Sequence, residues 1–193
     1  MTEPVPAPTG VPACLTGGGR PPLRLLARRA RLRLRFGRRI SLGKRSFLGR
    51  GVRLKLARGA RLTLGDGAWL GDRSTVRASG EVRVGAGTLI GVECVLAANE
   101  LVSIGERCLV GDEAMVSDTA LTVGDAGRSD GERPLSVRPV RVGDAVRVGP
   151  RACLLAGSRV GDGGVVGPTA VVDGAVARGA VVGGVPARSE RRR

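Results

Sequence analysis

Aliphatic residues recur every six positions along most of this chain. From residue 142 onward the sequence reads VGDAVRVGPRACLLAGSRVGDGGVVGPTAVV, in which Val142, Val148, Val160 and Val166 are each followed by glycine. Six is neither the period of an amphipathic helix nor that of a simple alternating strand. The pattern therefore predicts a repeat architecture built from hexapeptides.

The hexapeptides are grouped into coils over residues 42–183. Successive groups begin 22, 20, 20, 38 and 18 residues apart. Three hexapeptides make a coil of about 18 residues with three flat faces, and the surplus residues fall at corners. Each coil then pairs with the next as parallel strands about 4.8 Å apart. We expect an all-β parallel β-helix. The groups begin at Leu42, Leu64, Val84, Ile104, Val142 and Val160.

Within each hexapeptide, the aliphatic residue is predicted to point inward and a small residue at the fifth position to fit the narrow interior. Glycine or aspartate is expected at the turn of each hexapeptide, where positive φ is often needed. Cysteine packs well as a small hydrophobe. The predicted small inward residues are Ala68, Ser74, Cys94, Cys108, Ala114 and Ala170.

The 38-residue interval interrupts the hexapeptide repeat, because it contains the polar stretch TVGDAGRSDGERPLSVRP. One interpretation is an imperfect extra coil that begins at Val123. The other is a loop at about residues 122–139 that projects from the corner after Leu121. The loop is favoured because Pro134, Pro139 and the charges are hard to place in a stacked parallel sheet.

The two ends of the chain differ from the repeat. Residues 1–22 are rich in Pro and Gly and are predicted to be a disordered tail. Residues 23–41 form a basic segment, with a short helix first and a strand at residues 31–36, where Arg alternates with Leu or Phe. We expect this segment to cap the first open end of the repeat, or to be an amphipathic helix at a membrane surface. Residues 184–193 form a basic tail.

The net charge of +15 is concentrated at one end. Residues 1–61 hold 16 of the 32 basic residues and a single acid, Glu3, so this segment carries the whole net charge. Such asymmetry suggests an anionic membrane surface or polyanion bound through residues 20–61. An Arg-rich solvated surface is the alternative. Nucleic acid is disfavoured because only three aromatic residues are available for stacking.

Cysteine and histidine usage bears on the compartment and on metals. The four cysteines show no CxxC spacing and the chain has no His, so no metal site is predicted. No apolar stretch is long enough for a spanning helix. We expect a cytoplasmic protein with free thiols, peripheral at the membrane if the basic segment binds lipid.

The hexapeptides of residues 42–183, the interrupting polar loop and the terminal GGVPARSERRR resemble the hexapeptide-repeat acyltransferases, specifically the maltose/galactoside and sugar O-acetyltransferase branch. The resemblance implies a left-handed parallel β-helix and a homotrimer. It also implies that acetyl-CoA, or another acyl-CoA, lies in the groove between subunits. The acceptor would be a hydroxyl of a sugar or of a cell-envelope precursor.

In that family a His before the loop acts as general base, and this chain has none. The family's position falls at or beside Leu121. The family's substrate-orienting Asn is also missing, with Gly91 and Glu93 in its place. Asp118, Asp125 and Glu93 are the weak candidates for a base, and turn chemistry is the alternative role for both aspartates. The enzyme is therefore expected to be weakly active or inactive.

The cofactor positions that the resemblance implies lie in the last coils. The arginines there suit the phosphates of CoA, whereas each proline removes a backbone N–H. The alternative function is a non-catalytic scaffold that binds an anionic partner through its basic N-terminal segment. The implied cofactor positions are Pro150, Pro168, Asp173, Gly174, Arg188 and Arg191.

Overall fold

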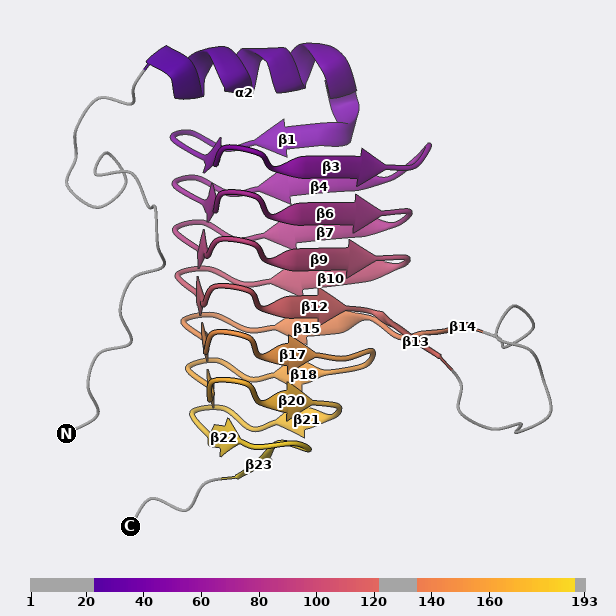
Figure 1. The fold of residues 1–193 in the computed structure, drawn as a ribbon, viewed down its shortest axis with the longest axis vertical. Coiled ribbons are helices and arrows are strands. Elements are labelled where there is room, and N and C mark those ends of the chain that lie inside the picture. The colour runs from indigo at the N-terminus through magenta and orange to yellow at the C-terminus, as the bar shows by residue number, and fades with distance from the viewer. Residues whose placement is uncertain (1–22, 122–134, 190–193) are drawn as a thin grey trace.

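A computed structural model of the chain describes residues 23–121 and 135–189. Helix α2 (Leu23–Phe36) and a 3₁₀ turn, η1 (Gly37–Arg39), lie across one end of a tall stack of short strands (Figure 1). The predicted tail at 1–22, residues 122–134 of the predicted loop and residues 190–193 lie outside the described residues. None of the described helices is long and apolar enough to cross a membrane.

The strands form three parallel sheets that wrap around the stack as a left-handed parallel β-helix, which confirms the predicted fold (Figure 1). Sheet A consists of β1 (Ile40–Leu42), β4 (Arg61–Leu64), β7 (Glu81–Val84), β10 (Leu101–Ile104), β15 (Val140–Val142), β18 (Arg159–Val160) and β21 (Ala175–Val176). Sheet B consists of β2 (Phe47–Leu48), β5 (Trp69–Leu70), β8 (Leu89–Ile90), β11 (Leu109–Val110), β16 (Arg147–Val148), β19 (Val165–Val166) and β22 (Val181–Gly183), and ends in β23 (Arg188–Ser189), which pairs antiparallel with β22. Sheet C consists of β3 (Arg53–Leu56), β6 (Thr75–Ala78), β9 (Val95–Ala98), β12 (Met115–Ser117), β17 (Cys153–Leu154) and β20 (Val171–Val172).

The core runs down the axis of the stack as columns of aliphatic side chains. Leu62, Leu70 and Leu96 are fully buried, one from each sheet. Close packing of such side chains leaves little room at the corners, which is why small residues fill the fifth positions. All six predicted small inward residues are buried, and Cys94 and Cys108 are free thiols among them.

The glycine after each inward aliphatic residue is required by the packing of neighbouring coils. A Cβ on Gly65 would lie 2.5 Å from the backbone nitrogen of Ala86, and a Cβ on Gly149 would lie 2.5 Å from that of Pro168. Positive φ occurs two positions later, for example at Gly67. These glycines are required because adjacent coils approach closely, whereas the expected positive φ is found at the turn residue itself, such as Gly67.

The aspartates of the Gly-Asp corners bind the coil before them. Asp66 Oδ1 accepts a hydrogen bond from the backbone nitrogen of Lys44 at 2.7 Å, and Asp144 Oδ1 accepts one from that of Glu106 at 2.8 Å. Corner N–H groups have no partner in the sheet ladders, so a carboxylate from the next coil satisfies them.

The 38-residue interval contains no additional coil among its described residues. Strand β10 pairs directly with β15, and Val102 lies opposite Val140. Between them, β13 (Thr119–Leu121) and β14 (Leu135–Val137) form an antiparallel hairpin that projects from the stack (Figure 1). The pairing agrees with the loop interpretation.

Helix α2 continues to Phe36, so the strand expected at residues 31–36 was wrong. Leu and Arg are strong helix formers. Leu32 and Phe36 are one helical turn apart and pack against the core, whereas Leu34 is 89% exposed. An alternating strand would have buried all three together, and the first coil offers a surface for only one helical face.

Candidate functional site

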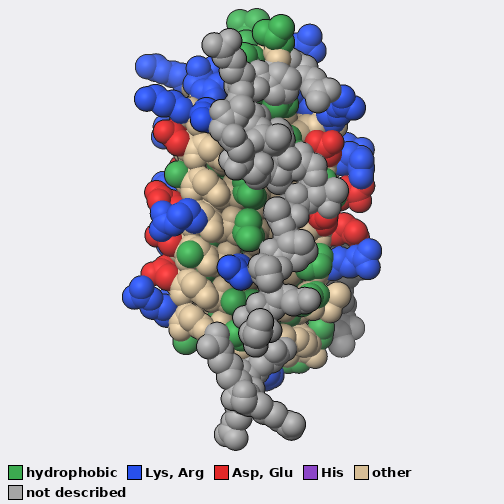
Figure 2. Space-filling model, turned by 90° about the vertical axis from the view of Figure 1, so that its left-hand side faces the viewer, with side chains coloured by type: hydrophobic (Ala, Val, Ile, Leu, Met, Phe, Trp, Pro, Cys, Tyr) green, Lys and Arg blue, Asp and Glu red, His purple; other side chains and the backbone are tan. Residues whose placement is uncertain are grey.

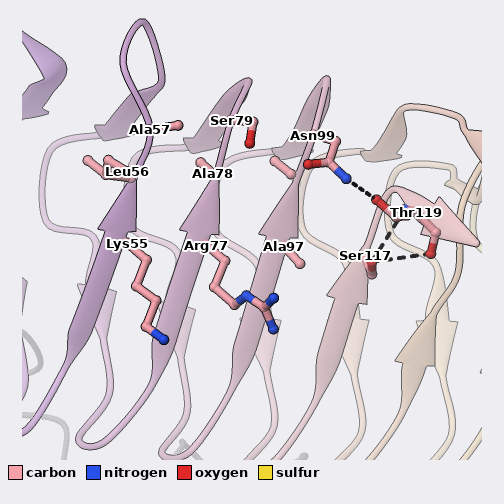
Figure 3. Close-up of a pocket in the computed structure, with 11 residues that line it drawn as sticks. Lys55, Leu56, Ala57, Arg77, Ala78, Ser79, Ala97, Asn99, Ser117 and Thr119 are labelled. Atoms are coloured by element: carbon pink, nitrogen blue, oxygen red, sulfur yellow. Dashed lines mark hydrogen bonds between the residues drawn. The ribbon is translucent and has the colours of Figure 1, made fainter. Parts of the chain in front are cut away.

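A groove of about 630 Å³ crosses the ends of β3, β6, β9 and β12, beside the projecting hairpin (Figure 3). Its walls come from sheet C and from the corners where the chain turns towards sheet A. The lining residues are Lys55, Leu56, Ala57, Arg77, Ala78, Ser79, Ala97, Ala98, Asn99, Ser117 and Thr119.

One end of the groove is cationic. Lys55 lies opposite Arg77 in the strand register, and Ala97 and Ser117 continue the same outward column. Both cationic side chains are exposed, and none of the residues that line the groove is acidic. Neighbouring strands are about 4.8 Å apart, and two cations on adjacent strands have the chemistry to bind an anionic group.

The other end is a cluster of amide and hydroxyl groups (Figure 3). Asn99 Nδ2 donates a hydrogen bond to Thr119 Oγ1 at 2.7 Å. The Thr119 backbone nitrogen donates to Ser117 Oγ at 3.3 Å, which holds the start of the hairpin against β12. This end offers neutral polar groups for sugar-like hydroxyls.

Asp118 adjoins the groove, but its carboxylate is directed at the backbone. The side chain is fully buried, and its oxygens accept hydrogen bonds from the backbone nitrogens of Asn99 (2.8 Å), Glu100 (2.7 Å) and Leu101 (2.9 Å). Thr119 Oγ1 donates a fourth bond at 3.1 Å. A carboxylate with this many donors holds the corner of the preceding coil and has little capacity left for an acceptor proton.

Glu93, a second base candidate, lies apart from Asp118. Glu93 sits at the corner between sheets B and C with φ of 56°, and its Oε1 is 2.6 Å from Arg73 Nε. The groove is at the opposite edge of sheet C. Leu121, at the family's His position, pairs through its backbone with Leu135 in the hairpin. Asp125 lies outside the described residues.

The predicted cofactor positions separate into two groups. Pro150 and Pro168 are exposed and occupy the same corner, between sheets B and C, in two successive coils. Asp173, Gly174 and Arg188 line a recess of about 380 Å³ at the C-terminal end of the stack. Arg191 lies outside the described residues.

The buried thiols are packing groups. Burial raises the pKa of Cys94 to about 12 and also raises that of Cys108. A thiol with a raised pKa is a poor nucleophile near neutral pH. In residues 23–121 and 135–189, no group of three or more His, Cys, Asp or Glu residues is placed to hold a metal ion.

Sequence reasoning missed the groove and its polar residues. The signal was present, because Lys55, Arg77, Ala97 and Ser117 follow one another at 22, 20 and 20 residues, which are the steps of the first coils. To recognise this signal, one has to know which outward residues of successive coils lie opposite one another. The hexapeptide pattern describes inward positions only.

The three-sided stack with its projecting hairpin defines the chain as a parallel β-solenoid. No protein-family model and no curated protein matches the sequence. Solved structures of similar fold include the following, each at low sequence identity. A point mutant of AntD, an N-acyltransferase from Bacillus cereus in complex with dTDP-4-amino-4,6-dideoxyglucose and coenzyme A, is 13% identical. The match covers 86% of this chain and 89% of that one, with a TM-score of 0.67.

Two acetyltransferases are also similar. A hexapeptide-repeat acetyltransferase from Vibrio cholerae is 22% identical over 88% of this chain and 81% of that one, with a TM-score of 0.55. A maltose O-acetyltransferase from Clostridium difficile 630 is 17% identical over 80% and 70%, also with a TM-score of 0.55. The chain therefore has the fold of the hexapeptide-repeat acyltransferases.

Proposed function

We propose that this chain is an acyl-CoA-dependent acyltransferase whose acceptor carries an anionic group. A fold alone does not determine activity, so the proposal depends on the groove beside the hairpin. The observation that carries it is the pairing of Lys55 and Arg77 at one end of a groove whose other end is polar and neutral. The shared fold with enzymes crystallised with coenzyme A supplies the donor class.

The anionic group of the acceptor binds between Lys55 and Arg77. A guanidinium offers two parallel N–H donors to a phosphate or carboxylate, and the ammonium adds a second charge. The body of the acceptor then extends along the outward column towards Asn99 and Ser117. This orientation brings its reactive group to the start of the projecting hairpin.

An amine suits this groove better than a hydroxyl as the reactive group. A hydroxyl must lose its proton as it attacks the thioester carbonyl, which requires a general base. No His, Asp or Glu lines the groove. A neutral amine attacks the thioester carbonyl carbon with its lone pair and forms the carbon–nitrogen bond. The carbon–sulfur bond then breaks, and the proton that the nitrogen loses passes to the departing sulfur, directly or through water, so that coenzyme A leaves as its thiol. Transfer to a hydroxyl, which the family resemblance implied, is the slower reaction.

The donor is proposed to use the C-terminal half of the stack. Arg188 is exposed at the recess with Asp173 and Gly174, and a cation there suits the phosphates of coenzyme A. Pro150 and Pro168 remain proposed contacts at the other corner of sheet C. A homotrimer would place these surfaces against a neighbouring subunit.

Thiol release from acetyl-CoA tests the proposal with three acceptors: a phosphorylated amino sugar, the same sugar phosphate with a hydroxyl in place of the amine, and the uncharged amino sugar. We expect the first to react fastest. Loss of the phosphate should raise KM at least about tenfold, as for a lost charge-assisted contact. Loss of the amine should lower kcat.

Two results together would contradict the acyltransferase proposal. If calorimetry shows no acetyl-CoA binding at millimolar concentration and no acceptor releases thiol, the acyltransferase proposal is wrong. The non-catalytic scaffold would then be the better description, because its basic segment does not depend on a donor site.

A further inference from the structure

The outward face of helix α2 carries a stripe of apolar side chains. Leu23 is 84% exposed, Leu26 43% and Leu34 89%. Ala27 and Ala30 are also exposed, and they lie between Leu23 and Leu34 on the same face of the helix. Of the five exposed large hydrophobic residues in the described chain, three are on this helix. An apolar stripe of this kind indicates an interaction surface.

The inward face fixes the orientation of the helix. Leu25 packs against Phe47 and Trp69, which are both almost completely buried. Leu32 and Phe36 pack against the main core. Because these side chains occupy the side that faces the first coil, the outward stripe cannot turn towards the solenoid.

Two arginines fasten the helix further. Arg29 donates from Nη1 to the carbonyl oxygen of Gly43 at 2.7 Å and from Nη2 to that of Leu42 at 3.0 Å. Arg33 Nη2 donates to the same Leu42 oxygen at 3.0 Å. Carbonyls of the first coil have no preceding coil to bind, so these contacts satisfy the open end of the stack.

Positive charge surrounds the stripe. Residues 23–61 contain fifteen Lys or Arg residues and no acid, so the rest of the chain sums to zero. Arg31 and Arg35 are exposed and lie beside the stripe on the helix. Figure 2 shows hydrophobic side chains at the top of the molecule with Lys and Arg around them, and acidic side chains only further down.

We propose that this end of the molecule docks on an anionic lipid bilayer, with α2 lying in the plane of the interface. The leucines enter the boundary between head groups and acyl chains, and the arginines bind lipid phosphates. The helix has 14 residues, which is about 21 Å and shorter than the hydrocarbon core of about 30 Å.

Other occupants explain only part of this surface. A polyanion would use the arginines but would leave the leucines in water. A second copy of this end would cover the leucines but would bring two strongly positive poles together, which is unfavourable. A bilayer with anionic lipids uses both features at once.

Docking also sets the position of the groove. Helix α2 lies across the end of the stack (Figure 1), so the solenoid stands upright on the membrane. The groove begins at Lys55, in the first coil below the helix. The docking proposal nevertheless stands on the helix alone and does not depend on acyl transfer.

Vesicle binding by the full chain tests the docking. The vesicles are phosphatidylcholine alone, or phosphatidylcholine with about 30% phosphatidylglycerol as the anionic lipid. We expect binding to the anionic vesicles only, weakened by added salt. The double variant Leu23→Ser, Leu34→Ser should bind at least about tenfold more weakly. Val185→Ser, which alters a residue 73% exposed on the far end of the stack, is the matched control and should bind normally.

Three results would overturn the docking proposal. Absence of binding to anionic vesicles is the first. Undiminished binding by the double variant is the second, because it would mean that charge alone acts, as for a polyanion. The third is a fall in oligomeric mass of the double variant in sedimentation, since a second copy would then cover the stripe. Thermal unfolding checks that both variants fold, and the thiol-release assay is independent of every one of these results.

Discussion

The coils before the projecting hairpin and the coils after it are built differently. Before it, successive coils are offset by 22, 20 and 20 residues, and strands β3, β6 and β9 of sheet C have four residues each. After it, the offsets are 18 and 16, and β17 and β20 have two residues each. We call these the wide half and the narrow half of the stack.

The difference in coil length explains why the groove lies in the wide half. The extra residues of a wide coil lengthen its sheet C strand, which adds one inward residue such as Leu56 and one outward residue such as Lys55. The added outward positions form the groove. Both halves keep the same glycine corners, so the frame is constant and the length of the coil determines where this groove forms.

The largest expected effect tests the constant frame. Gly65→Ala in the wide half and Gly149→Ala in the narrow half should each lower the free energy of unfolding by about 3 kcal/mol, because the new Cβ meets backbone of the next coil at 2.5 Å. Gly174→Ala is the control, since its Cβ meets no atom within 4 Å. Urea unfolding measures all three. A large difference between the first two variants would mean that the halves do not share one frame.

The next effect concerns the last wide coil. Asp118→Asn should lower the free energy of unfolding by about 2 kcal/mol, because the amide cannot accept all the backbone N–H bonds that the carboxylate accepts. Exposed Asp173→Asn should change it little. If Asp118→Asn instead unfolds normally and abolishes thiol release, Asp118 is a base and its structural role is wrong.

A smaller effect distinguishes the halves by function. Arg77→Ala in the wide half should raise KM for a phosphorylated acceptor about tenfold with little change in kcat, as expected for a lost binding contact. Arg159→Ala removes an exposed arginine from sheet A of the narrow half and should leave both constants unchanged. Equal losses in the two variants would place the acceptor elsewhere.

The smallest expected effect is on how the stability of the fold depends on pH. Burial raises the pKa of Cys94 from an ordinary 9.0 to about 12, so the folded chain holds this proton more tightly than the unfolded chain. The stability from this thiol is complete below pH 9 and is lost as the pH rises towards 12. The urea midpoint of the native protein should therefore fall at alkaline pH. Cys94→Ala should flatten that fall, and identical curves would mean that the thiol is not buried in solution.

The fold was predictable because the inward positions repeat. The period at Leu64, Val84 and Ile104 specifies stacked coils without any knowledge of the partners. A projecting loop was favoured because of Pro134 and Pro139, which a stacked sheet cannot easily hold, but the antiparallel pairing of β13 with β14 was not predicted. The helix end was missed because Leu32 and Phe36 fit two patterns. They alternate with arginine as in a strand, and they also lie one turn apart on one face of a helix. Only the packing of Leu32 and Phe36 on the first coil distinguishes the two.

The site was less predictable because outward positions carry no period of their own. Lys55 and Arg77 become neighbours only when the 22-residue step is known, and Asn99 meets Thr119 only at the start of the hairpin. Asp118 was a reasonable base candidate from its sequence position. Its engagement with three backbone nitrogens depends on the neighbouring coil, which no local pattern reveals.

A crystal structure of the protein with coenzyme A and a phosphorylated amino sugar tests the central claim most directly. We predict electron density for the sugar phosphate between Lys55 and Arg77, with the amine near Asn99 and the start of the hairpin. Density for the acceptor in the narrow half, with the groove of the wide half empty, would contradict the account.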